Sequence, residues 1–214
     1  MASQSPTARI YLLLYNSINA LLWLRILITV LRAYSQNLDV ISLPTLYTVL
    51  EPQVRWTQTL AVAEILHAAI GLTRSPVFTT FTQIFARSVQ VWAINYGFPA
   101  VTASSRAYAA MLFAWAVADA VRYSYFVVLL AGLHVPSVLR WLRYSLFIVL
   151  YPIGISAEWW LMYRAAGVTS SSLVAGIFYF CLGLYAPVFY PADKSGSIMM
   201  YSYMLRQRRK TLAK

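Results

Sequence analysis

Long apolar runs dominate the hydrophobic pattern of this chain and predict its elements. Six of them are about as long as the roughly 20 residues that a helix needs to cross the hydrocarbon core of a bilayer. They cover residues 10–31, 53–72, 76–96, 108–130, 144–163 and 171–190. The second and third runs are the least hydrophobic. The pattern predicts an all-α integral membrane protein, a six-transmembrane-helix bundle forming a single membrane domain over residues 1–214.

The segments between the runs predict turns and loops. The linker SQNLDVISLPTLYTVLEP contains Pro44 and Pro52 and predicts a partly interfacial loop before the second run. TRSP at residues 73–76 predicts a tight turn in which Pro76 opens the next helix. The polar N-terminus MASQSPTARI precedes a run too long for a signal-peptide core, so we expect a retained first span.

Composition supports a membrane protein and argues against nucleic-acid binding. The chain is 60% hydrophobic and only 11% charged, whereas a soluble domain carries about 25% charged residues. The net charge is +11, but the basic residues lie at the ends of apolar runs and in the tail 191–214 rather than on a polar domain. One cysteine, Cys181, excludes an intrachain disulfide framework.

The distribution of basic residues predicts that both termini are cytosolic. Six spans put the two termini on one side, and ten basic residues fall there: Arg9, Arg74, Arg140, Arg143, Lys194, Arg206, Arg208, Arg209, Lys210 and Lys214. The opposite loops hold four: Arg32, Arg55, Arg106 and Arg164. Without the tail the two sides are equal, so the tail decides the orientation.

Polar residues recur at similar depths inside the predicted spans. They are Arg25, Glu64, His67, Gln83, Arg87, Asp119, Arg122, Tyr151 and Glu158. At about 1.5 Å per residue, most of them fall in one slab in the cytosolic half of the membrane. The three arginines balance the three acids, and buried charges are tolerable in a bundle when they are paired. We therefore expect a polar, wet interior cavity.

Structural roles compete with functional ones for several of these residues. Asp119 and Arg122 are three positions apart on one helix and can simply neutralise each other. His67 fits a hydrogen-bonding interior residue better than a metal ligand, because no second histidine lies near it in the sequence. Gln83 and Gln90 share a face and fit residues that join helices by hydrogen bonds. We expect no metal site.

Tyr151 and Glu158 are the strongest candidates for chemistry. They are seven positions apart, almost two helical turns, so they share a face at a separation of about 10 Å along the axis. Pro152 and Gly154 predict a kink beside Tyr151 that tilts both side chains toward one cavity. A tyrosine and a carboxylate in a cavity suit acid–base chemistry on an apolar substrate; the alternative is a packed tyrosine and an ion-paired glutamate.

The same residues resemble a known family. YPIGISAE at 151–158 is similar to the signature of the membrane 3-hydroxyacyl-CoA dehydratases of very-long-chain fatty acid elongation. YLLLYNSINALLW at 11–23, AEILHAAIGLTRSP at 63–76 and DAVRYSY at 119–125 resemble further motifs of that family, in order and over essentially the whole chain. Gln83 and Arg87 fall where the family has a polar third helix. Asp119 departs from the family's usual glutamate, which keeps the charge but shortens its reach.

The resemblance implies that the chain is a hydro-lyase and that Tyr151 and Glu158 are its catalytic pair. The reaction is the elimination of water from a long-chain 3-hydroxyacyl-CoA to give the trans-2-enoyl thioester, without a redox cofactor or metal. Glu158 as base with Tyr151 as proton donor is one assignment, and the reverse is the other. The resemblance also implies other elongation-cycle membrane enzymes as partners and the endoplasmic reticulum membrane as location, although the ending KTLAK has no dilysine signal.

Three other functions compete with this one. Cys181 and Pro187 are six positions apart as in a phosphatase loop, but proline occupies the place of the phosphate-binding arginine, so we reject phosphatase activity. A transporter or channel also lines its path with polar residues, but no internal repeat is visible here. A non-catalytic scaffold of the same family is disfavoured because Tyr151 and Glu158 are both present.

Three arginines are candidates for binding the CoA head group. Arg74, Arg140 and Arg143 fall on the predicted cytosolic face, where acyl-CoA is available. Arginine binds phosphate through paired hydrogen bonds. The alternative for Arg140 and Arg143 is that they only fix the topology at the start of the fifth span.

Overall fold

The computed structural model describes residues 5–35 and 43–189, with only the backbone described for residues 184–189. Secondary structure in these residues is entirely helical, which confirms the all-α prediction. The basic tail 191–214, on which the predicted orientation depends, lies outside the described residues.

The helices follow the predicted spans with several differences. The first span is α1 (Pro6–Ser35) and the fourth is α6 (Arg106–Leu130). The third combines α4 (Val77–Val89) with a π-helix, η1 (Gln90–Tyr96), and is followed by the short α5 (Pro99–Thr102). The fifth combines α7 (Ser137–Ser145) with α8 (Phe147–Val168), and the sixth is α9 (Ser172–Phe189).

The second span differs most from the prediction. Helix α2 (Leu43–Leu60) begins within the segment that the prolines predicted to be a loop, so that prediction is wrong for residues 43–52. Pro44 fits because the first turn of a helix needs no backbone N–H donors. Leu46, Leu50 and Val54 recur at helical spacing and are buried, and this burial stabilises the helix through Pro52.

A tight turn at residues 61–62 separates α2 from α3 (Ala63–Ala69). The amides of Ala61 and Val62 donate to the carbonyls three residues earlier, as do those of Glu64 and Ile65. These short bonds interrupt the α-helical ladder. The predicted single span 53–72 is therefore two helices, with Glu64 and His67 on the second.

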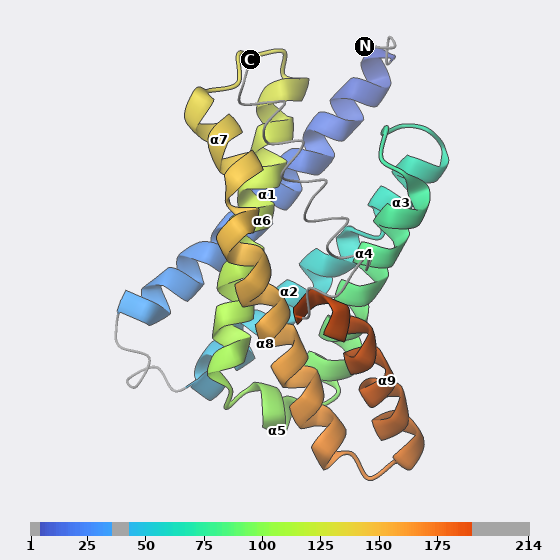
Figure 1. Cartoon of the computed structure of the whole chain (residues 1–214). Coiled ribbons are helices and arrows are strands. Elements are labelled where there is room, and N and C mark those ends of the chain that lie inside the picture. The colour runs from blue at the N-terminus through green and yellow to red at the C-terminus, as the bar shows by residue number, and fades with distance from the viewer. Residues whose placement is uncertain (1–4, 36–42, 190–214) are drawn as a thin grey trace.

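Helix α6 is the centre of the bundle and packs against both α1 and α8 (Figure 1). Small residues, including Ala109, Ala116 and Ala120 of α6 and Ala157 of α8, are buried at these contacts and let the helices approach closely. Larger side chains complete the core, among them Trp23, Tyr108, Leu112 and Leu161. Charged groups on α6 are consequently held at the middle of the molecule.

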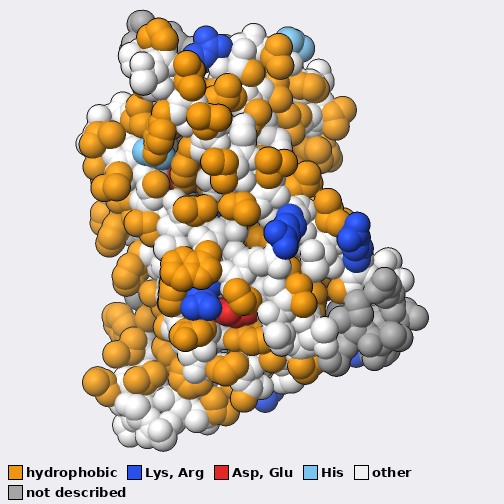
Figure 2. Space-filling view, turned by 180° about the vertical axis from the view of Figure 1, so that it is seen from behind, with side chains coloured by type: hydrophobic (Ala, Val, Ile, Leu, Met, Phe, Trp, Pro, Cys, Tyr) orange, Lys and Arg blue, Asp and Glu red, His pale blue; other side chains and the backbone are white. Residues whose placement is uncertain are grey.

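The outer surface is apolar. Figure 2 shows a face covered largely by hydrophobic side chains with few charged ones. Exposed large residues include Leu14, Leu21, Phe78, Leu173 and Phe180. In the part of the chain that the structure describes, α1 and α6 are long and apolar enough to cross a membrane, and so is the α7–α8 pair if its two helices form one span. Such a surface is typical of contact with lipid.

Candidate active site

Glu64 on α3 anchors one end of a partly buried polar network. Both of its oxygens accept hydrogen bonds from the guanidinium of Arg122 on α6, at 2.8 and 3.0 Å. The hydroxyl of Tyr123 donates to the same carboxylate, and the hydroxyl of Tyr15 on α1 lies 3.5 Å from it. A two-pronged arginine–carboxylate pair is among the stronger polar contacts in proteins, so it ties α3 firmly to α6.

Asp119 joins this pair to a second arginine. Its Oδ1 accepts from Arg122 Nε at 3.1 Å, and its Oδ2 lies 2.7 Å from Arg87 Nη2 on α4. The residue is only 4% exposed. Glu64, Arg122, Asp119 and Arg87, called the polar network below, thus form a series in which acids and arginines alternate. Each charge has an opposite partner, which offsets the large cost of removing it from water.

Trp115 connects the polar network to Glu158. The Arg87 guanidinium lies 4.0 Å from the centre of the Trp115 ring. The indole N–H of Trp115 donates a hydrogen bond to Glu158 Oε1 at 2.8 Å. Trp115 and Glu158 are 6% and 8% exposed, so the contact is inside the bundle. The hydrogen bond from Trp115 on α6 thereby holds the Glu158 carboxylate of α8 in place. The ring face of the same tryptophan contacts the Arg87 cation on α4.

Tyr151 lies on the same face of α8 as Glu158, with Gly154 between them. The spacing of three and then four residues puts the three in one line along the helix. Tyr151 is half-buried and within electrostatic reach of the Glu158 carboxylate. A methyl group at Gly154 would lie 3.9 Å from Glu158 Oε1, so the glycine keeps the surface between the two side chains low.

The bend of the fifth span lies earlier than the sequence predicted. Helices α7 and α8 meet at Leu146 with a bend of 41°, whereas α8 continues unbroken through Pro152. Pro152 is in the second turn of α8, and the carbonyl that it cannot bond belongs to Ile148, near the helix start. The bend therefore lies before the Tyr151–Glu158 face, which stays on one straight helix.

His67 lies beside the polar network without joining its ion pairs. Its Nε2 is 2.9 Å from the hydroxyl of Tyr11 on α1, and its ring meets the rings of Tyr11 and Tyr15 edge-on. This is the interior hydrogen-bonded environment that the sequence favoured over a metal site. Among the described residues, no three histidine, cysteine or acidic side chains group together in a way that would hold a metal ion.

Two of the predicted polar residues lie at the surface. Gln83 is exposed on α4, two turns before the buried Gln90. Arg25 is exposed and lines a groove of about 540 Å³ between α1 and α2, together with Trp56. The predicted charge balance therefore needs correction, because Arg25 does not enter the polar network. The structure directs its side chain to the outside of α1 instead of to the interior.

A second buried polar cluster was not predicted, although one member, Gln90, was expected to join helices by hydrogen bonds. It consists of Glu51, Arg55, Gln90 and Asn95. Glu51 and Arg55 of α2 form an ion pair at 2.7 Å, and the Arg55 guanidinium also lies 4.1 Å from the centre of the Tyr96 ring. Gln90 donates to Asn95 Oδ1 within the π-helix η1 at 3.2 Å. Arg55 had been assigned to a loop, because the helical segment before residue 53 was missed.

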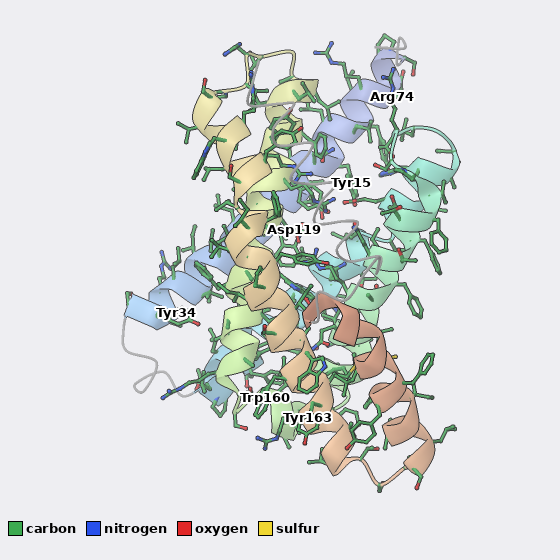
Figure 3. The ribbon with its side chains drawn as sticks, in the orientation of Figure 1. Tyr15, Tyr34, Arg74, Asp119, Trp160 and Tyr163 are labelled. Atoms are coloured by element: carbon green, nitrogen blue, oxygen red, sulfur yellow. The ribbon has the colours of Figure 1, made fainter. Side chains whose placement is uncertain are left out.

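The three head-group candidates lie at one end of the molecule. Arg74 is exposed in the turn between α3 and α4, beside the N-terminal end of α1 (Figure 3). Arg140 and Arg143 are half-buried on α7, at the same end (Figure 1). Arg143 is within electrostatic reach of Arg122 and Asp119. Arg143 is therefore the one of the three candidates that the structure links to the polar network.

Sequence reasoning missed Trp115, Tyr15 and Tyr123. Trp115 precedes Asp119 by four residues, so helical spacing alone places both on one face of α6. Tyr15 and Tyr123 lie within the quoted stretches at 11–23 and 119–125 but were not singled out. Spacing signals were thus available, but a tryptophan in a membrane helix is more often an anchor or core residue than a hydrogen-bond donor to an acid.

Comparison with known proteins identifies the family. The family described as "Protein tyrosine phosphatase-like protein, PTPLA" matches residues 58–214, which include Trp115, Tyr151, Glu158 and the whole polar network. The chain belongs to this family. Three relatives are each 34% identical to the chain. No solved structure matches it significantly.

All three relatives carry dehydratase names. The one from Schizosaccharomyces pombe, named "Probable very-long-chain (3R)-3-hydroxyacyl-CoA dehydratase", aligns over 94% of this chain and 91% of its own length. The one from Arabidopsis thaliana, "Very-long-chain (3R)-3-hydroxyacyl-CoA dehydratase PASTICCINO 2", aligns over 98% and 96%. The one from Homo sapiens, "Very-long-chain (3R)-3-hydroxyacyl-CoA dehydratase 2", aligns over 97% and 83%.

Proposed function

We propose that this protein is a very-long-chain (3R)-3-hydroxyacyl-CoA dehydratase of the fatty acid elongation cycle. The observation that carries the proposal is the near full-length similarity to relatives with that name from a fungus, a plant and an animal. The structure adds support, since the half-buried Tyr151 and the buried Glu158 share one face of α8. An elimination of water needs a base and an acid on one substrate.

In the proposed reaction Glu158 is the base and Tyr151 the acid. The Glu158 carboxylate takes the proton on the carbon next to the thioester, and the electron pair of that C–H bond becomes the second bond between C2 and C3. The C3–O bond breaks, and the leaving hydroxide takes the Tyr151 proton to form water. Return of the proton from Glu158 to the tyrosinate restores both groups. Glu158 already accepts an N–H bond from Trp115, which suits a carboxylate that receives a proton.

We infer that the protein is a six-span membrane enzyme with both termini in the cytosol. Helices α1, α4 with η1, and α8 run one way along the molecule, whereas α2 with α3, α6 and α9 run the other way (Figure 1). The apolar surface supports lipid contact. We place the enzyme in the endoplasmic reticulum membrane with other elongation-cycle enzymes, and the CoA head group near Arg74, Arg140 and Arg143, next to the polar network.

The test is dehydration by the purified protein reconstituted in liposomes. We expect a long-chain (3R)-3-hydroxyacyl-CoA to yield the trans-2-enoyl-CoA, detected by mass spectrometry. The (3S) enantiomer is the matched control. It should react far more slowly, because an acid and a base in fixed positions can reach the hydroxyl group and the C2 proton together in only one configuration. Absence of enoyl product from the (3R) substrate, with folded protein, would overturn the proposal.

A further inference from the structure

Trp115 has a position that neither acid–base chemistry nor simple packing explains. It is 6% exposed at the contact of α6 with α8, yet its polar edge is directed at an acid and its ring face at a cation. A packing residue at this place needs only its volume. The same ring contacts an acid, Glu158, with its N–H and a cation, Arg87, with its face, and this pair of contacts indicates a further role.

The hydrogen bond from Trp115 restricts the Glu158 carboxylate. A glutamate side chain can rotate about three bonds, and rotation about the last of them turns the carboxylate itself. The 2.8 Å bond to the indole N–H fixes Oε1 against α6. Because Trp115 Cδ1 also lies near the Gly154 position, at 3.9 Å from where a methyl group would be, the indole edge forms part of the surface beside Glu158.

The cation on the ring face strengthens this arrangement. The Arg87 guanidinium, 4.0 Å from the ring centre, is held by Asp119 at 2.7 Å, so it cannot move freely away from the indole. A cation over an indole face is attracted by the ring electrons and draws electron density from the N–H, which makes that group a better donor. The charge of Arg87 is thus felt at Glu158 through Trp115.

We propose that Trp115 is a positioning residue that orients the Glu158 carboxylate for proton abstraction and couples it to the Arg87–Asp119 pair. This inference rests on the proposed dehydratase function. It assigns Trp115 no contact with the substrate. It also gives the polar network a role in turnover besides holding the helices together, because Trp115 connects Arg87 of that network to the Glu158 base.

Trp115→Phe tests the proposal, because it keeps an aromatic ring and removes the N–H donor. We expect kcat for the 3-hydroxyacyl-CoA to fall roughly 10- to 100-fold, with KM within about twofold, since a misplaced catalytic group costs turnover more than binding. Trp23→Phe is the matched control. Trp23 is also buried and also faces Arg87, at 5.4 Å, but lies on α1. It should lower the melting temperature similarly while kcat changes little.

A double-mutant cycle separates positioning from general loosening of the fold. In a Glu158→Gln background, Trp115→Phe should lower the residual kcat less than twofold, because the group that it positions no longer acts. Equal effects in both backgrounds would overturn the proposal, as would a Trp115→Phe enzyme with wild-type kcat. A wild-type protein without dehydratase activity would instead overturn the proposed function itself.

A measurement on the unaltered tryptophan covers the case in which Trp115→Phe does not fold. In protein labelled at its seven tryptophans, one indole N–H resonance should move upfield in Glu158→Ala relative to wild type, because its charged acceptor is lost. The same resonance should be weakly affected by Glu51→Ala, which removes a buried acid elsewhere. If no indole resonance responds to Glu158→Ala, the proposal is wrong.

Discussion

The two buried polar regions of this molecule bury charge in different ways. The polar network of Glu64, Arg122, Asp119 and Arg87 takes its residues from three helices, and every ion pair but one crosses between elements. In the second cluster, Glu51 and Arg55 pair one turn apart on α2 alone. The first arrangement depends on the assembled bundle, whereas the second can form as soon as α2 is helical.

Hydrogen bonding is incomplete in both regions. In the part of the chain that the structure describes, the buried atoms without a hydrogen-bond partner include Gln90 Oε1 and Asn95 Nδ2 in the second cluster and Arg87 Nε in the polar network. Gln90 and Asn95 both belong to the π-helix η1, a rare type of helix that often occurs at functional sites. The carboxylate of Glu64, by contrast, accepts from two side chains on α6. The comparison teaches that the ion pairs of the polar network tie α3, α4 and α6 together, whereas the ion pair of the second cluster stays within α2.

The largest expected effect is a loss of kcat when the candidate acid–base pair beside the polar network is changed. Glu158→Gln and Tyr151→Phe should each lower kcat by roughly 10²- to 10⁴-fold, because proton transfer is removed while shape is kept. Glu51→Gln, which alters an equally buried acid in the second cluster, should leave kcat per folded molecule nearly unchanged. Near wild-type turnover by both active-site variants, assayed as purified proteins, would show that the pair is assigned wrongly.

Arg122→Ala should produce the largest loss of stability. It leaves Glu64 without its main partner and Asp119 with only one, and stranding a buried charge typically costs about 3–5 kcal/mol. The measurement is the free energy of unfolding from titration with a denaturing detergent, together with activity per folded molecule. A stable but inactive Arg122→Ala protein would contradict this structural role and place Arg122 in the active site.

Arg140→Gln with Arg143→Gln should have an intermediate effect, on binding. We expect KM for the acyl-CoA to rise roughly threefold to tenfold and its salt dependence to flatten, since partly exposed arginine–phosphate contacts are screened by salt. Arg106→Gln is the control, because Arg106 is exposed at the opposite end of α6. An unchanged KM in a correctly oriented double variant would mean that both arginines serve topology alone.

The smallest effect is expected when the second cluster loses both charges together. Glu51→Gln with Arg55→Gln leaves no unpaired ion, and such paired replacements are often nearly neutral. Loss of the Arg55 contact with Tyr96 adds a little, so we expect about 1–2 kcal/mol of lost stability in the same detergent titration. A loss as large as that of Arg122→Ala would remove the distinction between the two regions.

Much of the helical framework could be predicted from the sequence. Apolar runs located α1, α6 and α8 closely, because burial in a bilayer demands continuous apolar length that is visible residue by residue. The start of α2 could not be predicted, since two prolines argued for a loop and only packing of its apolar face outweighs them. The break at residues 61–62 left no composition signal; only the structure shows its three-residue hydrogen bonds.

Although it wrongly placed Arg25 inside, the sequence by itself located the acids Glu64, Asp119 and Glu158 within apolar helices and, through helical spacing, put Tyr151 and Glu158 on one face. Only the tertiary structure decided their partners. Glu64 meets Arg122 across 58 positions, and Glu158 meets Trp115 across 43. Such contacts depend on which helices are neighbours and on how each is rotated about its axis. Those quantities are set by packing of the whole bundle, so no local pattern contains them.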